Sequence, residues 1–83
     1  MSGPGRKREV SDEEILRAIR LHADPVVTAR EVADIVDMSS QGVNKRLREL
    51  VDQELIVRKE VGARAVIYWL SDAGRGRLSP SSG

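Results

Sequence analysis

The stretch Ser39-Ser40-Gln41-Gly42-Val43-Asn44-Lys45-Arg46-Leu47-Arg48-Glu49-Leu50 decides the fold of this 83-residue chain. At about 100° per residue, its apolar residues share one face with the spacing of a packed helix. These apolar residues are Val43, Leu47, Leu50 and the following Val51. The opposite face holds Gln41, Lys45 and Arg48, with Asn44 at its border. Amides and cations of this kind reach both phosphates and base edges, although a solvated helix face explains them equally well from this stretch alone.

The composition is that of one small globular domain with an aliphatic core. Hydrophobic residues make up 40% of the chain, and its only aromatic residues are Tyr68 and Trp69. The lack of cysteine excludes disulfides and thiolate metal sites and suits a reducing compartment. No apolar run approaches the roughly 20 residues of a membrane helix, and no signal-peptide pattern is present. We therefore expect a cytoplasmic protein that does not associate with membranes.

Charge is distributed unevenly, although the net charge is only +1. Residues 11–38 carry seven carboxylates and three arginines, whereas residues 39–83 carry eight cations and five carboxylates. A basic region on a nearly neutral chain favours nucleic-acid binding, and a mixed solvated surface is the alternative.

The chain divides into one domain, residues 11–78, and two flexible ends. Residues 1–10 contain three cations and two glycines around a proline, which predicts a flexible basic tail. Such a tail can lie along phosphates, reach into a minor groove or stay in solvent. Residues 79–83, Ser-Pro-Ser-Ser-Gly, are expected to be disordered.

Two capping boxes predict two helices before the opening stretch. Ser11-Asp12-Glu13-Glu14 starts the first, with Val10 and Ile15 as its hydrophobic staple, and Asp24-Pro25 is expected to end it. Thr28-Ala29-Arg30-Glu31 starts the second, after a very short β-type piece at Val26-Val27. The residues expected to face inward are Ile15, Leu16, Ile19, His22 and Ala23 on the first helix, and Val32, Ala33, Ile35 and Val36 on the second.

A three-residue turn, Asp37-Met38-Ser39, is predicted to join the second helix to the third. Three residues can turn one helix steeply onto another, and aspartate tolerates the left-handed conformation that such turns need. Ser39 is a good N-cap for the third helix, which should end near Asp52 or Gln53.

Two β-rich runs, residues 55–61 and 64–70, flank Gly62-Ala63 and predict a hairpin. Alternation places Val66, Tyr68 and Leu70 on one face of the hairpin, and Ile67 and Trp69 on the other. Ser71 could cap a further short helical turn, which two glycines weaken.

This order of elements resembles a winged helix-turn-helix domain, an α+β fold with three helices, a short strand and a two-stranded wing. Residues 28–33 and 39–50 look like the helix-turn-helix signature of small prokaryotic transcription regulators of the MarR, ArsR and PadR kind. Residues 53–56 and 68–75 look like the entry to and exit from the wing. Two positions depart from the pattern: Asp37 stands where glycine is usual, and Gly42 where threonine is common.

The leading hypothesis is therefore a transcription regulator that reads double-stranded DNA, with the third helix (about residues 40–53) in the major groove. Its wing would contact flanking phosphates or the minor groove. The expected DNA-binding residues are Thr28, Ser39, Ser40, Gln41, Asn44, Lys45, Arg48, Arg58, Lys59 and Arg64. Among them, the amide side chains can form paired hydrogen bonds with adenine, and the cations can bind guanine or phosphate. A homodimer on two half-sites is expected, formed through Ile67 and Trp69 or through the first helix.

Other functions have less support in the sequence. A protein-interaction winged helix, such as a general transcription subunit, would use the acidic first two helices and Trp69. A Z-DNA-binding winged helix is suggested by Asn44 and Trp69, but Arg48 and Ala65-Val66 stand where that branch has a tyrosine and two prolines. With a single histidine, no cysteine and no glycine-rich phosphate loop, we expect no enzyme, cofactor or metal site. The operator and any effector are left open.

Overall fold

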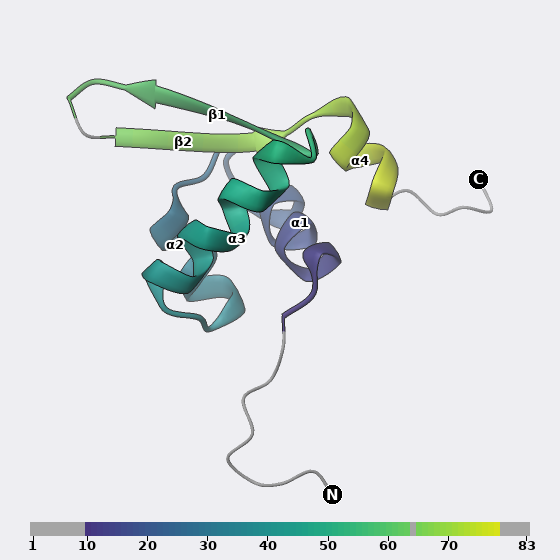
Figure 1. The fold of residues 1–83 in the computed structure, drawn as a ribbon, viewed down its shortest axis with the longest axis horizontal. Helices are drawn as coiled ribbons and strands as arrows, with labels where there is room; N and C mark the ends of the chain where they lie inside the picture. The colour runs from purple at the N-terminus through teal and green to yellow at the C-terminus, as the bar shows by residue number, and fades with distance from the viewer. Residues whose placement is uncertain (1–9, 64, 79–83) are drawn as a thin grey trace, which may run out of the picture.

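The computed structural model describes residues 10–63 and 65–78. Its elements are the helices α1 (Asp12–Leu21), α2 (Ala29–Val36) and α3 (Ser40–Asp52), the strands β1 (Ile56–Val61) and β2 (Ala65–Leu70), and the helix α4 (Asp72–Leu78). The hairpin lies across one end of the helices, with α3 in front of α1 (Figure 1). Of the two ends that we expect to be flexible, residues 1–10 and 79–83, all but Val10 lie outside the described residues, as does Arg64.

Both predicted capping boxes are present. The Ser11 hydroxyl accepts the Glu14 N–H at 3.1 Å, and the Glu14 carboxylate accepts the Ser11 N–H at 2.9 Å. Thr28 and Glu31 repeat the arrangement at 3.2 and 2.9 Å. The residue before each cap is buried, as a hydrophobic staple requires; Val10, at the edge of the expected tail, is only 7% exposed. These local signals therefore position the starts of α1 and α2.

The end of α1 differs from the prediction. The helix ends at Leu21, three residues before Asp24, because the backbone of His22 is extended at φ −64° and ψ 146°. The Nδ1 atom of His22 accepts the N–H of Asp24 at 3.1 Å, a side-chain turn that competes with the helix. The expectation that the helix continues to Asp24-Pro25 is wrong, and Ala23 is exposed rather than part of the buried face. His22 is half-buried.

The turn between α2 and α3 is as predicted. Asp37 adopts the left-handed conformation at φ 59° and ψ 50°, and the Met38 N–H closes the end of α2 on the Ala33 carbonyl at 3.1 Å. The Ser39 hydroxyl accepts the Gly42 N–H at 3.0 Å and caps α3. The sequence thus fixes both the place of the turn and the first residue of α3.

The core lies between the three helices and the inner face of the hairpin. Its largest fully buried side chains are Ile15, Leu16, Val27, Val32, Val43, Leu47, Leu50 and Ile56. Ile35, which we expected to be buried, is 51% exposed, and Leu21 is 74% exposed. Ile35 lies at the edge of the α2 stripe and lines a surface groove with Leu21, between α1 and α2. The prediction for Ile35 is wrong because the buried stripe of α2 is narrower than its apolar run.

The hairpin has a regular antiparallel register, from Ile56 opposite Leu70 to Val61 opposite Ala65. Val27 pairs with Tyr68 on the other side of β2, through bonds of 2.9 and 2.8 Å, so the predicted β-type piece is a single bridge. As alternation predicts, Tyr68 and Leu70 are buried, whereas Ile67 and Trp69 on the outer face are half-buried.

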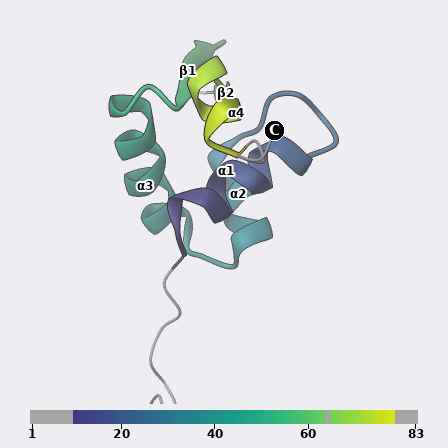
Figure 2. The same cartoon turned by 90° about the vertical axis from the view of Figure 1, so that its right-hand side faces the viewer.

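The short helix α4 forms despite its two glycines. The Ser71 hydroxyl accepts the Gly74 N–H at 3.0 Å and donates to the Glu54 carbonyl at 2.7 Å. A Cβ at position 74 would lie 2.0 Å from the Leu55 carbonyl oxygen, so only glycine allows this approach. The close contact between α4 and the Leu55 carbonyl therefore requires glycine at position 74, although glycine is a poor helix former. Figure 2 shows α4 above α1, the helix to which it is tied by the ion pair between Arg77 and Glu13.

Candidate nucleic-acid interface

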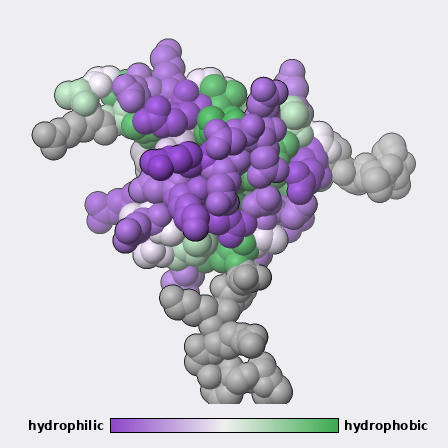
Figure 3. Space-filling model, in the orientation of Figure 1, coloured by the Kyte–Doolittle hydropathy of each residue, from purple (hydrophilic) through white to green (hydrophobic). Residues whose placement is uncertain are grey.

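The outer face of α3 carries four exposed polar side chains that we call the reading face: Gln41, Asn44, Lys45 and Arg48. Within residues 10–63 and 65–78, none of the four has a side-chain hydrogen bond or an ion pair. Together with Ser39 and Gly42 they surround one shallow hollow. Figure 3 shows this face as a continuous hydrophilic surface over the middle of the molecule. The face thus offers donors and positive charge to an outside partner.

The back of α3 is held rigidly. Val43, Leu47 and Leu50 have no exposed surface, and Val51 is half-buried at the edge. A close-packed core leaves such a helix little freedom to rotate or slide. The reading face therefore keeps its orientation without support from its own polar groups.

Gly42 has a local explanation in the cap. A Cβ at this position would lie 3.2 Å from the Ser39 hydroxyl oxygen and 3.3 Å from the terminal methyl of Met38. Both separations are tighter than ordinary contacts, so a side chain would press on the hydroxyl that caps α3. The glycine keeps this cap undisturbed and leaves the hollow open.

A notch joins the reading face to the wing. Its lining includes Asn44 and Arg48 of α3 and Arg58 and Tyr68 of the hairpin. Arg58 and Tyr68 are opposite each other in the register, so both side chains lie on the inner face. Hydrogen bonds to Tyr68 and then to Glu60 raise the pKa of Arg58 above its ordinary value. Arg58 therefore brings a positive charge, which arginine carries at any physiological pH, to the edge of the reading face.

The other predicted wing cations do not gather with Arg58. Lys59 lies opposite Ile67, so it projects from the outer face of the hairpin, away from α3. Arg64 is outside the described residues. The structure thus brings Arg58 to the reading face and separates Lys59 from it, because neighbouring residues of a strand alternate in direction.

The remaining predicted residues lie at helix starts. The hydroxyls of Thr28 and Ser39 accept backbone N–H groups in their caps, and each retains its own proton to donate. Ser40 is exposed at the first position of α3. All three residues can serve phosphates, and Thr28 and Ser39 can do so while they keep their capping role.

Two residues of this region were not identified from the sequence. Tyr68 lies opposite Arg58 and raises its pKa, and the only sequence signal for this pairing is the cross-strand register. Arg46 looks like another cation of α3, but its guanidinium binds Asp12 at 2.7 Å and the Val10 carbonyl. No local pattern predicts a contact between residues 34 or more positions apart.

The fold and the exposed helix define a winged helix-turn-helix domain. A family model described as winged helix-turn-helix DNA-binding matches residues 8–57, and the chain belongs to that family. No curated protein matches the chain.

Solved structures share the fold. MepR of Staphylococcus aureus, a transcription regulator of the multidrug efflux pump MepA, is 21% identical with a TM-score of 0.72, over 84% of this chain and 53% of MepR. A MarR-family transcription regulator is 26% identical with a TM-score of 0.69, over 80% and 44% of the two chains. Lactococcus lactis ZitR in complex with DNA is 24% identical with a TM-score of 0.60, over 84% and 49%. The chain therefore spans about half the length of these proteins.

None of the helices in the described part of the chain has the length and apolar character needed to cross a bilayer.

Proposed function

We propose that this chain is the DNA-binding part of a transcription regulator and reads the major groove with α3. The observation that carries the proposal is the reading face: four exposed polar side chains without partners in the described residues, on a helix whose back is fully buried. Gln41 and Asn44 suit adenine, and Arg48 suits guanine, whereas Lys45 suits guanine or phosphate. Family membership and the ZitR–DNA structure support this reading.

The wing supplies positive charge on one side of α3. Arg58 lies at the notch with Asn44 and Arg48, so it is placed to contact a phosphate beside the bases that α3 reads. Helix starts supply further donors. The hydroxyls of Thr28, Ser39 and Ser40 donate hydrogen bonds to phosphates of the DNA. Lys59 projects from the outer face of the hairpin, so any contact it makes is with more distant phosphates or the minor groove; the same role is proposed for Arg64, which lies outside the described residues.

A single domain reads only a few base pairs, so we propose a homodimer on two half-sites. The half-buried Ile67 and Trp69, or the exposed Leu21 on α1, are the apolar surfaces available for it. The named relatives are transcription regulators, and the part that this chain matches covers about half of their length. The proposal places the protein in the cytoplasm and involves no catalytic step, cofactor or metal.

One observation favours a second function, a protein-interaction winged helix. Leu21 and Ile35 are strongly exposed on the groove between α1 and α2, which shares no lining residue with the hollow of the reading face. A partner protein could cover them. This function needs no DNA contact at α3, which makes the two proposals separable.

The test is a titration of labelled random-sequence duplex DNA, followed by fluorescence anisotropy between about 50 and 200 mM salt. We expect the affinity to fall steeply as the salt concentration rises. In NMR spectra recorded with the same duplex, we expect chemical-shift changes at residues 39–48 and around the wing. No duplex binding at low salt would overturn the proposal. Shift changes confined to Trp69 and α1 would favour the protein-interaction function instead.

A further inference from the structure

Arg58, the wing arginine at the notch, lies beside a carboxylate of its own strand. One of its Nη atoms donates to Oε2 of Glu60 at 3.3 Å. Residues two apart point to the same face of a strand, so Glu60 shares the inner face of the hairpin with Arg58. Val66, which is opposite Glu60 in the register, lines the notch together with Tyr68. The carboxylate therefore lies one register step from Arg58 toward the tip of the hairpin.

Glu60 differs in charge from the surface beside it. It is the only acidic residue on the strands β1 and β2. The lining of the notch contains two arginines and an asparagine but no acid, and the lining of the hollow on the reading face contains no acid either. Glu60 thus brings a negative charge to the edge of a surface that otherwise offers donors and positive charge.

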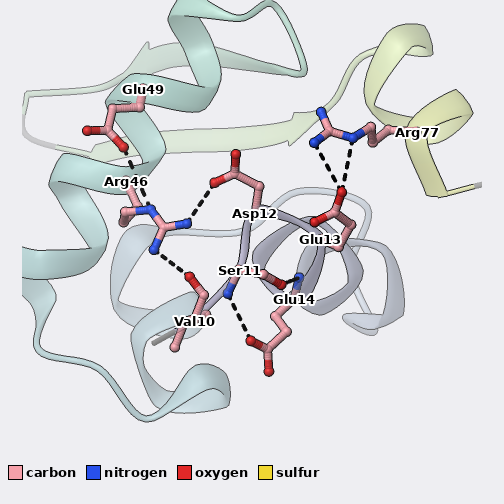
Figure 4. Close-up of polar contacts among 8 residues, drawn as sticks. All are labelled: Val10, Ser11, Asp12, Glu13, Glu14, Arg46, Glu49 and Arg77. Atoms are coloured by element: carbon pink, nitrogen blue, oxygen red, sulfur yellow. Dashed lines mark hydrogen bonds and ion pairs between the residues drawn. The ribbon is translucent and has the colours of Figure 1, made fainter. Parts of the chain in front are cut away.

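The pair between Arg58 and Glu60 is weaker than the pairs that hold the helices together. Figure 4 shows one of those, Arg77 of α4 with Glu13 of α1, at 3.0 Å and 64 positions apart. The wing pair is longer, and the side chains of Arg58 and Glu60 are 44% and 70% exposed. Water and salt screen such an exposed pair. Because the pair joins neighbours on one strand, another anion can replace the carboxylate without opening the fold.

A phosphate of the DNA backbone is the anion that suits this position. Phosphate and carboxylate oxygens accept hydrogen bonds from the same guanidinium donors. Arg48 borders the same notch and adds positive charge on its other side, whereas Glu60 contacts only Arg58 among the described residues. A phosphate at Arg58 would also repel the neighbouring carboxylate, so the two anions compete for one arginine.

We propose that the Glu60 carboxylate takes the place of a DNA phosphate at Arg58 in the DNA-free protein, and that binding exchanges one for the other. This inference rests on the proposed function, because it requires Arg58 to face the DNA backbone. Glu60 thereby lowers the affinity for every duplex by the same factor, since phosphates carry no base identity. It limits how tightly the domain binds and leaves base preference to α3.

The first experiment is a double-mutant cycle of Glu60→Gln and Arg58→Gln, read by fluorescence anisotropy on random duplex at about 50 mM salt. We expect Glu60→Gln alone to raise affinity about three- to six-fold, because it frees Arg58 and removes a repulsion. In the Arg58→Gln background the same change should raise affinity less than two-fold. Thermal unfolding on the same samples shows that each variant is folded.

Two results of this cycle would overturn the inference. An affinity that Glu60→Gln leaves unchanged or lowers would show that the carboxylate does not compete with DNA. Equal gains with and without Arg58 would show that Glu60 repels DNA without acting through this arginine. In both cases binding by the unchanged chain leaves the proposed function intact, whereas no binding by the unchanged chain would overturn the proposed function and this inference together.

Glu13→Gln is the matched control for net charge. It also removes one carboxylate and one ion pair with an arginine, but the pair joins α1 to α4. We expect its affinity for random duplex to stay within two-fold of that of the unchanged chain. On an operator selected from random DNA, Glu60→Gln should give the same gain as on random duplex. Equal gains from Glu13→Gln and Glu60→Gln, or a gain on one DNA only, would contradict the exchange at Arg58.

The second experiment follows the carboxylate itself by NMR of the ¹³C-labelled chain. The Cδ resonance of Glu60 in free Arg58→Gln gives the chemical shift of the carboxylate without its arginine. On saturation of the unchanged chain with duplex, we expect the Glu60 resonance to move toward that value. A Glu60 resonance that stays in place while resonances of α3 move would show that the carboxylate keeps its arginine in the complex, which would overturn the exchange.

Discussion

The reading face of α3 and the first turn of α1 (residues 11–14) are both polar and charged, yet they differ in how their side chains are used. In the first turn of α1, the hydroxyl and the carboxylates bind the backbone of the turn itself or arginines of α3 and α4. On the reading face, none of the four side chains has a partner among the described residues. The polar groups of the first turn therefore stabilise the fold, whereas those of the reading face point outward.

The same contrast appears within one helix. Arg46 and Arg48 are two residues apart, but Arg46 binds α1 while Arg48 is exposed at the hollow and the notch. Charge and position in the sequence do not distinguish them; their directions around the helix do. Substitutions should therefore separate into those that change stability and those that change binding.

The largest effect is expected from the support behind the reading face. Leu47→Ala removes a side chain with no exposed surface and should lower the free energy of unfolding by about 2–5 kcal/mol. Urea denaturation monitored by circular dichroism measures this. Since stability is marginal in so small a domain, partial unfolding at 25 °C is an expected result. A loss below about 1 kcal/mol would mean that the back of α3 is not closely packed.

The next effect concerns binding alone. Arg48→Ala should leave the free energy of unfolding within about 0.5 kcal/mol, because the side chain has no partner in the described residues. It should weaken binding to an operator selected from random DNA by about 1–3 kcal/mol, and binding to random duplex by less. Arg17→Ala, at an exposed arginine of α1, is the control and should change neither. Equal losses on both DNAs would indicate that Arg48 contacts only phosphate.

The sequence predicts features that depend on a few neighbouring residues. Ser11, Thr28 and Ser39 cap their helices as expected, because a capping hydroxyl reaches a backbone N–H only three residues away. Asp37 is left-handed for the same local reason. The buried and exposed faces of α3 follow from its periodicity, so the reading face was predicted residue by residue; its contacts with DNA stay predictions.

Features that depend on distant residues could not be predicted. Arg46 meets Val10 and Asp12 only after the three helices pack, and Gly74 is required only because the Leu55 carbonyl approaches it. Ile35 is apolar and near the buried stripe, but the position of α1 decides whether it is covered. In each case the deciding partner is far along the chain, where propensity and periodicity carry no information.

A smaller effect is expected in the first turn of α1. Ser11→Ala removes the hydroxyl that accepts the Glu14 N–H and should cost about 1 kcal/mol of stability. DNA affinity of the folded protein should change less than about two-fold, because the hydroxyl serves only the cap. Thermal unfolding and anisotropy on the same sample check both values. A large loss of affinity with normal stability would show that this turn contacts DNA and would break the contrast with the reading face.

The smallest effect is expected at the turn that sets α3 against α2. Asp37 is held at φ 59°, a conformation that costs a non-glycine residue more than it costs glycine. Asp37→Gly relieves this strain but gains chain entropy in the unfolded state, so the net increase in stability should be only about 0.3–1 kcal/mol. Asp37→Val is the matched control and should destabilise by more than glycine stabilises, because a β-branched side chain suits this conformation least. DNA affinity should not change with glycine, since the turn acts through its backbone angle alone. A loss of affinity with unchanged stability would instead place the Asp37 carboxylate among the groups that orient the reading face.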